Sequence, residues 1–198
     1  MELSALSADA TSPFWREIEA VTLCETISGA SPQQATSVRV AWNAEELRVL
    51  FHSEDAHISA TLTEHDAALY TEEVVEVFLD PVGDLECYFE IEVNPLNAVL
   101  DLVLRRNRSG YRKDFAWDCA DLRTRVRCEA ASWSAELSIP FTSLTGRSPT
   151  PGTEWRANFT RIDRPPGVER ELSAWSPTRM PTFHVPKRFG VLQFAASR

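Results

Sequence analysis

Two neighbouring segments of the chain, residues 73–80 and 88–94, alternate between apolar and polar side chains. At the two-residue period of a β-strand, one face of the strand pair carries Val75, Val77, Leu79, Phe89, Ile91 and Val93. The opposite face carries Glu76, Glu90, Glu92 and Asn94. Like charges placed across a strand pair are destabilising, so a sheet that keeps this acidic face needs a use for it. The candidates are a bound cation, the hydroxyl groups of a sugar, and simple solvation.

Short alternating runs bounded by turn residues recur along the whole sequence and predict an all-β protein. The predicted strands lie at about residues 37–42, 47–52, 73–80, 86–94, 98–105, 121–128, 132–139, 154–162, 170–175 and 189–194. Pro140 ends one of these strands, because proline cannot continue the interior of a sheet. A turn of helix is expected to follow over residues 141–144.

Eight to eleven strands in one domain pack as two antiparallel sheets face to face, which predicts a β-sandwich of the jelly-roll kind. The expected core consists of Val38, Val40, Val49, Phe51, Val75, Val77, Leu79, Phe89, Ile91, Val93, Leu137, Ile139 and Phe159. With 198 residues and no linker rich in glycine and serine, the chain is expected to form a single domain over residues 1–198.

Composition excludes two classes of partner. Hydrophobic residues make up 43% of the chain, and no apolar run approaches the roughly 18 residues that span a bilayer, so no membrane partner is expected. A net charge of -9 and a pI near 5.0 argue against nucleic acid, whose phosphates need a basic surface. The oligomeric state is left open.

The first residues, 1–7, have neither a basic region nor a sustained apolar run, so they do not form a signal peptide as written. The protein is therefore expected in the cytoplasm unless the chain is a processed form. Its cysteines, Cys24, Cys87, Cys119 and Cys128, are far apart and form no CxxC pair, which predicts buried free thiols. A disulfide is the alternative for an exported protein.

Residues around the acidic strands are suited to binding a sugar. Tyr70 lies in a loop beside the first acidic strand, where its ring can stack on a pyranose or, alternatively, plug the end of the sandwich. Carboxylate and amide groups accept hydrogen bonds from vicinal hydroxyls, which favours Glu76, Glu90, Glu92 and Asn94 as ligand contacts. Ion pairing with arginines is the alternative. Arg161 belongs to this candidate set, although the alternation leaves its face open.

A proline-rich segment near the C-terminus carries several aromatic residues, and loops of this kind are often functional. Phe183 and His184 are expected to contact the ligand. Trp175 is included as a ligand contact, with packing in the core as its alternative.

Enzymatic function has weaker support. Two neighbouring carboxylates also occur in glycosidases, but their acid and nucleophile roles normally need contrasting environments, which one crowded acidic face does not offer. The sequence contains no nucleophile elbow, no glycine-rich phosphate loop and no HExxH motif. We therefore expect a binding protein and not an enzyme, with glycoside hydrolysis as the remaining catalytic alternative.

Several short motifs in a fixed order together resemble the family 9 carbohydrate-binding modules and their relatives in the DOMON-like superfamily. These motifs are the runs at 36–42 and 47–49, Tyr70 with 73–80, the run at 133–140, Asn158-Phe159, and Phe189-Gly190. The resemblance covers nearly the whole chain and implies a β-sandwich that binds sugar without catalysis.

The family's sugar binders hold a terminal sugar between two tryptophans, with carboxylate, arginine and amide side chains on its hydroxyls. By motif, the first tryptophan corresponds to Tyr70, the strand glutamate to Glu76 and the amide to Asn94. The second tryptophan corresponds to a position near Phe183. Glu92 stands where the family's arginine is expected.

The resemblance also implies other ligands. Calcium is structural in the family, and loop carboxylates that could supply oxygen ligands are Asp55, Asp66, Asp80 and Asp84. Some DOMON-like domains carry haem between a methionine and a histidine, and Met180 precedes His184 by four residues. A further alternative is an interaction module whose sugar site has degenerated.

Overall fold

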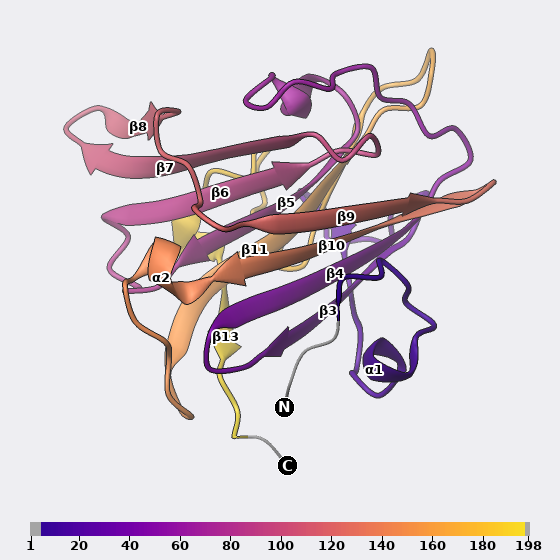
Figure 1. Cartoon of the computed structure of the whole chain (residues 1–198). Helices are drawn as coiled ribbons and strands as arrows, with labels where there is room; N and C mark the ends of the chain where they lie inside the picture. Colours follow the sequence, from indigo (N-terminus) through magenta and orange to yellow (C-terminus); the bar gives the residue numbers. More distant parts are fainter. Residues whose placement is uncertain (1–4, 197–198) are drawn as a thin grey trace.

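The structure is a computed structural model that describes residues 5–196. Residues 1–4 and 197–198, which the predictions for the N-terminus and for the whole-chain domain include, lie outside the described residues. Two antiparallel sheets pack face to face (Figure 1), which confirms the predicted β-sandwich.

The first sheet has five strands, in the order β1 (Val21–Thr22), β3 (Thr36–Trp42), β4 (Glu46–Glu54), β10 (Ser132–Pro140) and β9 (Arg123–Cys128). The path of the second runs β2 (Cys24–Glu25), β12 (Glu171–Ala174), β11 (Glu154–Asp163), β5 (Val74–Asp80), β6 (Cys87–Val93), β7 (Val99–Asn107) and β8 (Gly110–Asp114). The eighth strand of this sheet, β13 (Gly190–Gln193), pairs with the first half of β11. We call it the eight-stranded sheet.

Turns and helices are short. The hairpin between β3 and β4 closes on Asn43, whose side-chain oxygen accepts hydrogen bonds from the backbone amides of Glu45 and Glu46 at 2.8 and 2.9 Å. Helix α2 (Phe141–Leu144) follows β10 directly, which confirms the predicted helical turn. The other helical turns are α1 (Pro13–Arg16), η1 (Leu69–Thr71) and η2 (Pro186–Arg188).

Strand β8 was not predicted, because residues 105–114 are highly charged and show no apolar alternation. The chain reverses at a tight turn in which the Asn107 side chain accepts the backbone N–H of Ser109 at 2.9 Å, and Gly110 takes φ +132°, where a Cβ would be strained. The two-residue strands β1 and β2 are too short to give a period and were also missed.

The space between the sheets is filled by the expected core. Every predicted core residue is buried except Val40, which is partly buried and packs against the same cluster. Phe89 lies at the margin, where its ring contacts Trp117 with centroids 4.8 Å apart.

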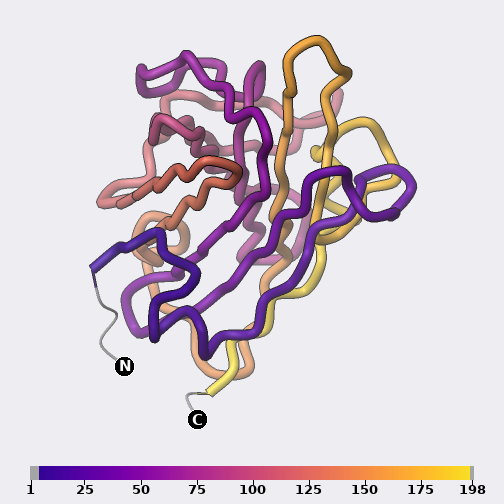
Figure 2. The backbone as a smooth tube through the Cα atoms, turned by 90° about the vertical axis from the view of Figure 1, so that its right-hand side faces the viewer, coloured from indigo at the N-terminus to yellow at the C-terminus, as the bar shows by residue number. Residues whose placement is uncertain are grey.

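The acidic face of β5 and β6 is not open to solvent, which makes the solvation alternative wrong. All seven residues of β5 are buried, and Glu76 and Glu90 are each 2% exposed and Glu92 0%. A second apolar cluster covers this outer face of the eight-stranded sheet and includes Leu69 from η1 and Phe183 and Phe189 from the C-terminal segment. Figure 2 shows that segment in yellow beside the orange β11–β12 hairpin.

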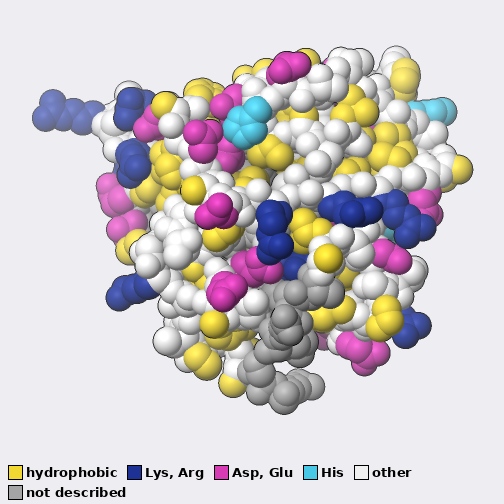
Figure 3. All heavy atoms as spheres, viewed as in Figure 1, with side chains coloured by type: hydrophobic (Ala, Val, Ile, Leu, Met, Phe, Trp, Pro, Cys, Tyr) yellow, Lys and Arg dark blue, Asp and Glu magenta, His cyan; other side chains and the backbone are white. Residues whose placement is uncertain are grey.

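The face seen in Figure 3 carries basic and acidic side chains interspersed with one another. On the five-stranded sheet, Arg48 pairs with Glu136 and Glu46, and Arg123 pairs with Glu46 at 2.6 Å. The N-terminal segment adds hydrogen bonds from the backbone amides of Ser7 and Ala8 to Glu136, each 2.8 Å. The net negative charge is therefore not gathered on one open acidic surface there.

All four cysteines are free. The predicted burial is confirmed for Cys119, is partial for Cys24 and Cys87, and is wrong for Cys128, which is exposed on the edge strand β9. Among residues 5–196, no helix has the length and apolar character that crossing a membrane requires.

Candidate functional site

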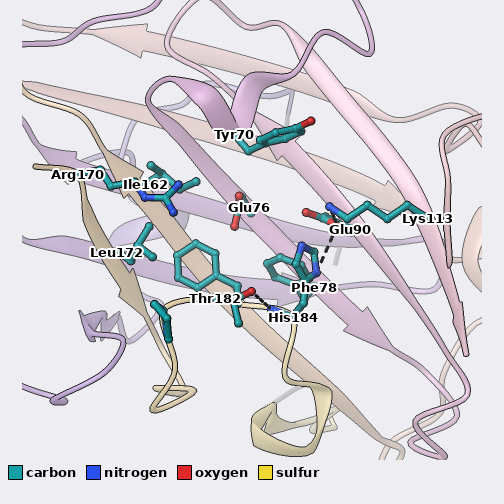
Figure 4. A pocket seen from close by; sticks show the side chains of 12 residues that line it. Tyr70, Glu76, Phe78, Glu90, Lys113, Ile162, Arg170, Leu172, Thr182 and His184 are labelled. Atoms are coloured by element: carbon teal, nitrogen blue, oxygen red, sulfur yellow. Dashed lines mark hydrogen bonds and ion pairs between the residues drawn. The ribbon is translucent and has the colours of Figure 1, made fainter. Parts of the chain in front are cut away.

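A pocket opens on the outer face of the eight-stranded sheet, between η1 and the segment that leads to η2. The cavity measures about 140 Å³ and is open to solvent, so it is smaller than the clefts of about 300–1,000 Å³ that enclose drug-sized ligands. Its lining residues are Tyr70, Glu76, Phe78, Glu90, Lys113, Ile162, Arg170, Leu172, Pro181, Thr182, Phe183 and His184. In Figure 4, Tyr70 lies on one side of the pocket and Phe78 and His184 on the other, with Glu76 and Glu90 between them.

The pocket floor is built by the register of two strands. Glu76 on β5 pairs with Glu92 on β6, and Phe78 pairs with Glu90, so the three carboxyl groups share one face with an aromatic ring. One carboxylate oxygen from each glutamate lies within 4.8 Å of the other two. Glu76 accepts a hydrogen bond from the hydroxyl of Thr160 on β11. Neither side-chain oxygen of Glu92, nor Oε2 of Glu90, has a hydrogen-bond donor among the described residues.

Burial dominates the ionisation of these carboxyl groups. It raises the pKa of Glu76 to about 8, with the charge of Glu90 adding to the shift, and it raises the pKa of Glu90 to about 7. Burial together with the charges of Glu76 and Glu90 raises the pKa of Glu92 well above its usual value. Near neutral pH the floor therefore offers protonated carboxyl groups, which donate hydrogen bonds, beside ionised ones, which accept them.

Charged and polar groups surround the floor. Lys113 on β8 has its Nζ 3.8 Å from Glu90 Oε2 and 5.5 Å from the centroid of the Tyr70 ring. His184 Nδ1 lies 3.1 Å from the hydroxyl of Tyr88 and 3.9 Å from Glu90 Oε2. Burial, with Lys113 adding to it, lowers the pKa of His184 to about 4, so the imidazole is neutral at pH 7. Arg170, the residue before β12, also lines the pocket.

The structure brings most of the sequence-predicted site residues together. Tyr70, Glu76, Glu90, Phe183 and His184 line the pocket, and Glu92 lies against Glu76 and Glu90 on its floor. Tyr70 is 38% exposed and free to contact a ligand. Phe183 is buried, with its ring 6.3 Å from Phe78 between centroids, so it belongs to the pocket wall.

Three predicted residues are not brought to the pocket. Asn94 is buried in the β6–β7 turn, where it donates to the carbonyl of Leu62 at 2.8 Å and accepts from the amide of Ala98 at 2.9 Å. Trp175 packs toward the core, with its ring 5.6 Å from Phe159 and against Gly190, where a Cβ would lie 2.5 Å from the indole.

Arg161 is the third. It pairs across β11 and β5 with Val75, on the face between the sheets, and its guanidinium Nη2 lies 2.9 Å from Asp55 and 3.3 Å from Asp163. It therefore does not neutralise the pocket glutamates. Its role in the structure is to supply the positive charge for a separate buried group formed by Asp55, Glu73 and Asp163.

Several pocket residues were missed by the sequence reasoning. Lys113 comes from the unpredicted strand β8, so no signal pointed to it. A signal did exist for Phe78, which alternates with Glu76 and thus shares its face. Arg170 and Leu172 alternate along the predicted strand 170–175, in register to reach the same side of the sheet.

The carboxylates considered for calcium on sequence grounds are not gathered in one place. Asp55 is paired with Arg161, whereas Asp66 belongs to a mostly exposed group with His65, Asp101 and Asp118. Asp80 accepts the backbone amides of Gly83 and Leu85, and Asp84 accepts that of Glu86. These four residues therefore do not form a common ligand set.

The methionine and the histidine considered as haem ligands lie in different surroundings. Met180 is 51% exposed and lies outside the pocket lining, whereas His184 lines the pocket and contacts Tyr88. Only one of the two side chains lines the pocket, so the residues present do not fit an axial pair there.

Comparison with known protein families gives a match over residues 8–196 to the model described as "Carbohydrate family 9 binding domain-like". The chain belongs to this family. Among curated proteins, no match was found.

Solved structures share the fold of this family 9 chain. A family 9 carbohydrate-binding module from Caldicellulosiruptor kristjanssonii in complex with cellotriose has a TM-score of 0.75 and 16% identity, covering 100% of this chain and 92% of that one. The module from the same organism in complex with glucose gives 0.70 and 17%, covering 99% and 94%. A protein from Bacteroides uniformis gives 0.75 and 20%, covering 90% and 87%.

Proposed function

We propose that the chain, residues 1–198, acts as one non-catalytic carbohydrate-binding module that holds a sugar ring in the pocket beside Tyr70. The observation that carries the proposal is the pairing of an exposed aromatic ring with buried carboxyl groups in one open pocket. Pyranose rings need both parts, because their axial C–H groups pack on aromatic faces while their hydroxyls need polar partners.

The polar groups of the pocket suit vicinal hydroxyls. Glu76 and Glu90 lie between Tyr70 and His184 (Figure 4), and their raised pKa values supply both donors and acceptors near neutral pH. The neutral imidazole of His184 and the cations Lys113 and Arg170 extend this set at the pocket rim. Hydrogen bonds to charged groups are stronger than neutral ones, yet a single ring is expected to bind only with a Kd of about micromolar to millimolar.

The carboxyl groups favour binding over hydrolysis. A glycosidase keeps one carboxyl group protonated and the other ionised by giving them contrasting surroundings. Glu76 and Glu90 instead share the same burial, and the pKa of each is raised.

Glucose and cello-oligosaccharides are the first ligands to test, because the two Caldicellulosiruptor modules were solved with cellotriose and with glucose. The experiment is calorimetric titration of the purified protein with mono- and oligosaccharides, repeated with Tyr70→Ala. We expect the substitution to weaken binding at least tenfold, which corresponds to about 1.4 kcal/mol. It should leave the fold intact because the ring is on the surface.

The matched control is Phe115→Ala, which removes an exposed aromatic ring (44% exposed) outside the pocket. It should bind as the wild type does. If Tyr70→Ala bound sugar with the same affinity as the wild type, the pocket would not be the sugar-binding site. If no saccharide bound at all, an interaction module would be favoured.

A further inference from the structure

Three buried glutamates share the pocket floor, and among residues 5–196 the one lysine or arginine that pairs with any of them is Lys113, 3.8 Å from Glu90 Oε2. Glu76, Glu90 and Glu92 are at most 2% exposed, and one oxygen of each lies within 4.8 Å of the others. Both oxygens of Glu92 and one of Glu90 receive no hydrogen bond from the described residues. Buried carboxylates are normally hydrogen-bonded, paired or bound to a metal, so this group requires a cation or protons.

The basic side chains nearby do not neutralise the three carboxyl groups. Lys113 Nζ reaches only Glu90 Oε2, at 3.8 Å, which is beyond hydrogen-bond distance. His184 Nδ1 lies 3.9 Å from the same oxygen, also beyond hydrogen-bond distance, and is 3.1 Å from the hydroxyl of Tyr88 instead. Arg170 acts on Glu76 only through its charge. Glu92, which is fully buried, has no basic side chain in contact among residues 5–196.

The other buried acidic group of the chain shows the contrast. In the group formed by Asp55, Glu73 and Asp163, the guanidinium of Arg161 pairs with the two aspartates, with Nη2 at 2.9 Å from Asp55 and 3.3 Å from Asp163. In that group the chain supplies its own cation. At the pocket floor no arginine or lysine takes the corresponding place between the carboxylates in the described chain.

We propose that Glu76, Glu90 and Glu92 bind one Ca²⁺ ion at the floor of the pocket. The donors are carboxylate oxygens alone, which favour a hard cation over zinc or copper. Ca²⁺ accepts irregular sets of oxygens at about 2.3–2.6 Å, whereas Mg²⁺ demands a near-ideal octahedron at about 2.0–2.1 Å and keeps several of its waters, so a set of three buried carboxylates favours Ca²⁺.

A Ca²⁺ ion could enter this site from solvent, and the three glutamates would leave some of its coordination positions unfilled. Glu76 and Glu90 line the open pocket, so an ion can reach them from solvent. Three carboxylates supply at most six oxygens, and Ca²⁺ takes about six to eight. The remaining positions face the pocket, where sugar hydroxyls would complete the coordination; this second step rests on the proposed function.

The competing account neutralises the group with protons, one of them shared between Glu92 and Glu90. Calcium titration of the chelator-treated protein distinguishes the two accounts, using calorimetry with CaCl₂ alone and Tb³⁺ luminescence as a second readout. The test variant is Glu92→Gln, which keeps the shape of the side chain, with Glu90→Gln as its duplicate. The control is Glu73→Gln, the same change in the group that already holds Arg161. Circular dichroism checks that each variant is folded.

We expect the wild type to bind Ca²⁺. Glu92→Gln should bind one equivalent of Ca²⁺ fewer, or should bind that equivalent at least fivefold more weakly. Glu73→Gln should bind Ca²⁺ as the wild type does. The proposal is overturned if the wild type binds no Ca²⁺, or if both test variants keep the same number of sites with less than a fivefold change in affinity.

Sugar titration with Ca²⁺ and with EDTA separates this proposal from the proposed function. Weaker sugar binding in EDTA supports direct coordination of the hydroxyls. Equal sugar binding in both overturns that second step but leaves the calcium site and the sugar site standing. Calcium binding without any sugar binding overturns the proposed function and not the calcium site.

Discussion

Glu76 on β5 lies directly opposite Glu92 on β6, and the two buried carboxyl groups face the same side of the eight-stranded sheet. Such a pair is destabilising unless something is bound to it or protons neutralise it. The two-residue alternation of β5 and β6 thus places carboxyl groups on the floor of the pocket. It also shows how a sheet face that is normally left to solvent becomes the base of a binding site once loops cover it.

Stability is expected to depend on pH through Glu73. Burial, together with the charges of Asp55 and Asp163, raises the pKa of Glu73 from 4.5 to about 8. Between these two values the folded protein keeps a proton that the unfolded chain releases. The stability that Glu73 contributes is therefore complete below about pH 4.5 and is lost as the pH rises toward 8.

Denaturant unfolding at several pH values between about 5 and 8 measures this effect, which amounts to at most about 1.4 kcal/mol per pH unit for one proton. Glu73→Gln, which stays neutral, should show a flatter decline than the wild type. Glu64→Gln, an exposed glutamate, should keep the wild-type slope. If Glu73→Gln and the wild type decline in parallel, Glu73 does not hold this proton.

Arg161→Gln is expected to destabilise the protein without affecting sugar binding. The substitution leaves Asp55 and Asp163 buried without their cation, and breaking a buried pair in this way costs about 3–5 kcal/mol. Thermal unfolding and sugar titration below the melting temperature measure the two effects. The exposed Arg125 provides a control, because Arg125→Gln should change neither. A selective loss of sugar affinity would return Arg161 to the binding site.

Glu136→Ala is expected to lower the free energy of unfolding by about 3 kcal/mol. Glu136 pairs with Arg48 and accepts the amides of Ser7 and Ala8, so its loss weakens the ion pair and releases the N-terminal segment. Denaturant unfolding measures the change, and faster proteolysis near the N-terminus should accompany it. Glu129→Ala, which removes an exposed glutamate from the turn between β9 and β10, should be close to neutral.

Phe183→Ala is expected to lower both stability and sugar affinity, unlike Tyr70→Ala. Phe183 is buried in the cluster that covers the outer sheet face, and emptying such a site costs about 3–5 kcal/mol. Because the ring also forms the pocket wall, its loss should distort the site. Phe183→Leu should recover most of the stability. Full stability of Phe183→Ala in thermal unfolding would show that this wall is not packed as described.

The β-sandwich and its core were predictable because one face of each central strand is apolar at a strict two-residue period, as in Val75, Val77 and Leu79. The covered outer face was not predicted, although a signal existed. Phe78 alternates with Glu76, and Tyr88 with Glu90, so the acidic face carries aromatic rings that favour burial.

The site was predictable only in part. Tyr70, Glu76 and Glu90 follow from strand alternation and from the loop next to it. Lys113 and the inward direction of Arg161 could not be predicted, because they depend on a charged hairpin without alternation and on the packing between the sheets. The position of Lys113 and the side-chain direction of Arg161 both depend on strand pairings between segments that are distant in the sequence.

The most direct test of the central claim is amide NMR of the labelled protein titrated with glucose and with a cello-oligosaccharide. The account predicts saturable shifts concentrated at Tyr70, Glu90 and His184, and the loss of these shifts in Tyr70→Ala. Saturable shifts centred away from the pocket, or no shifts with any saccharide, would contradict it.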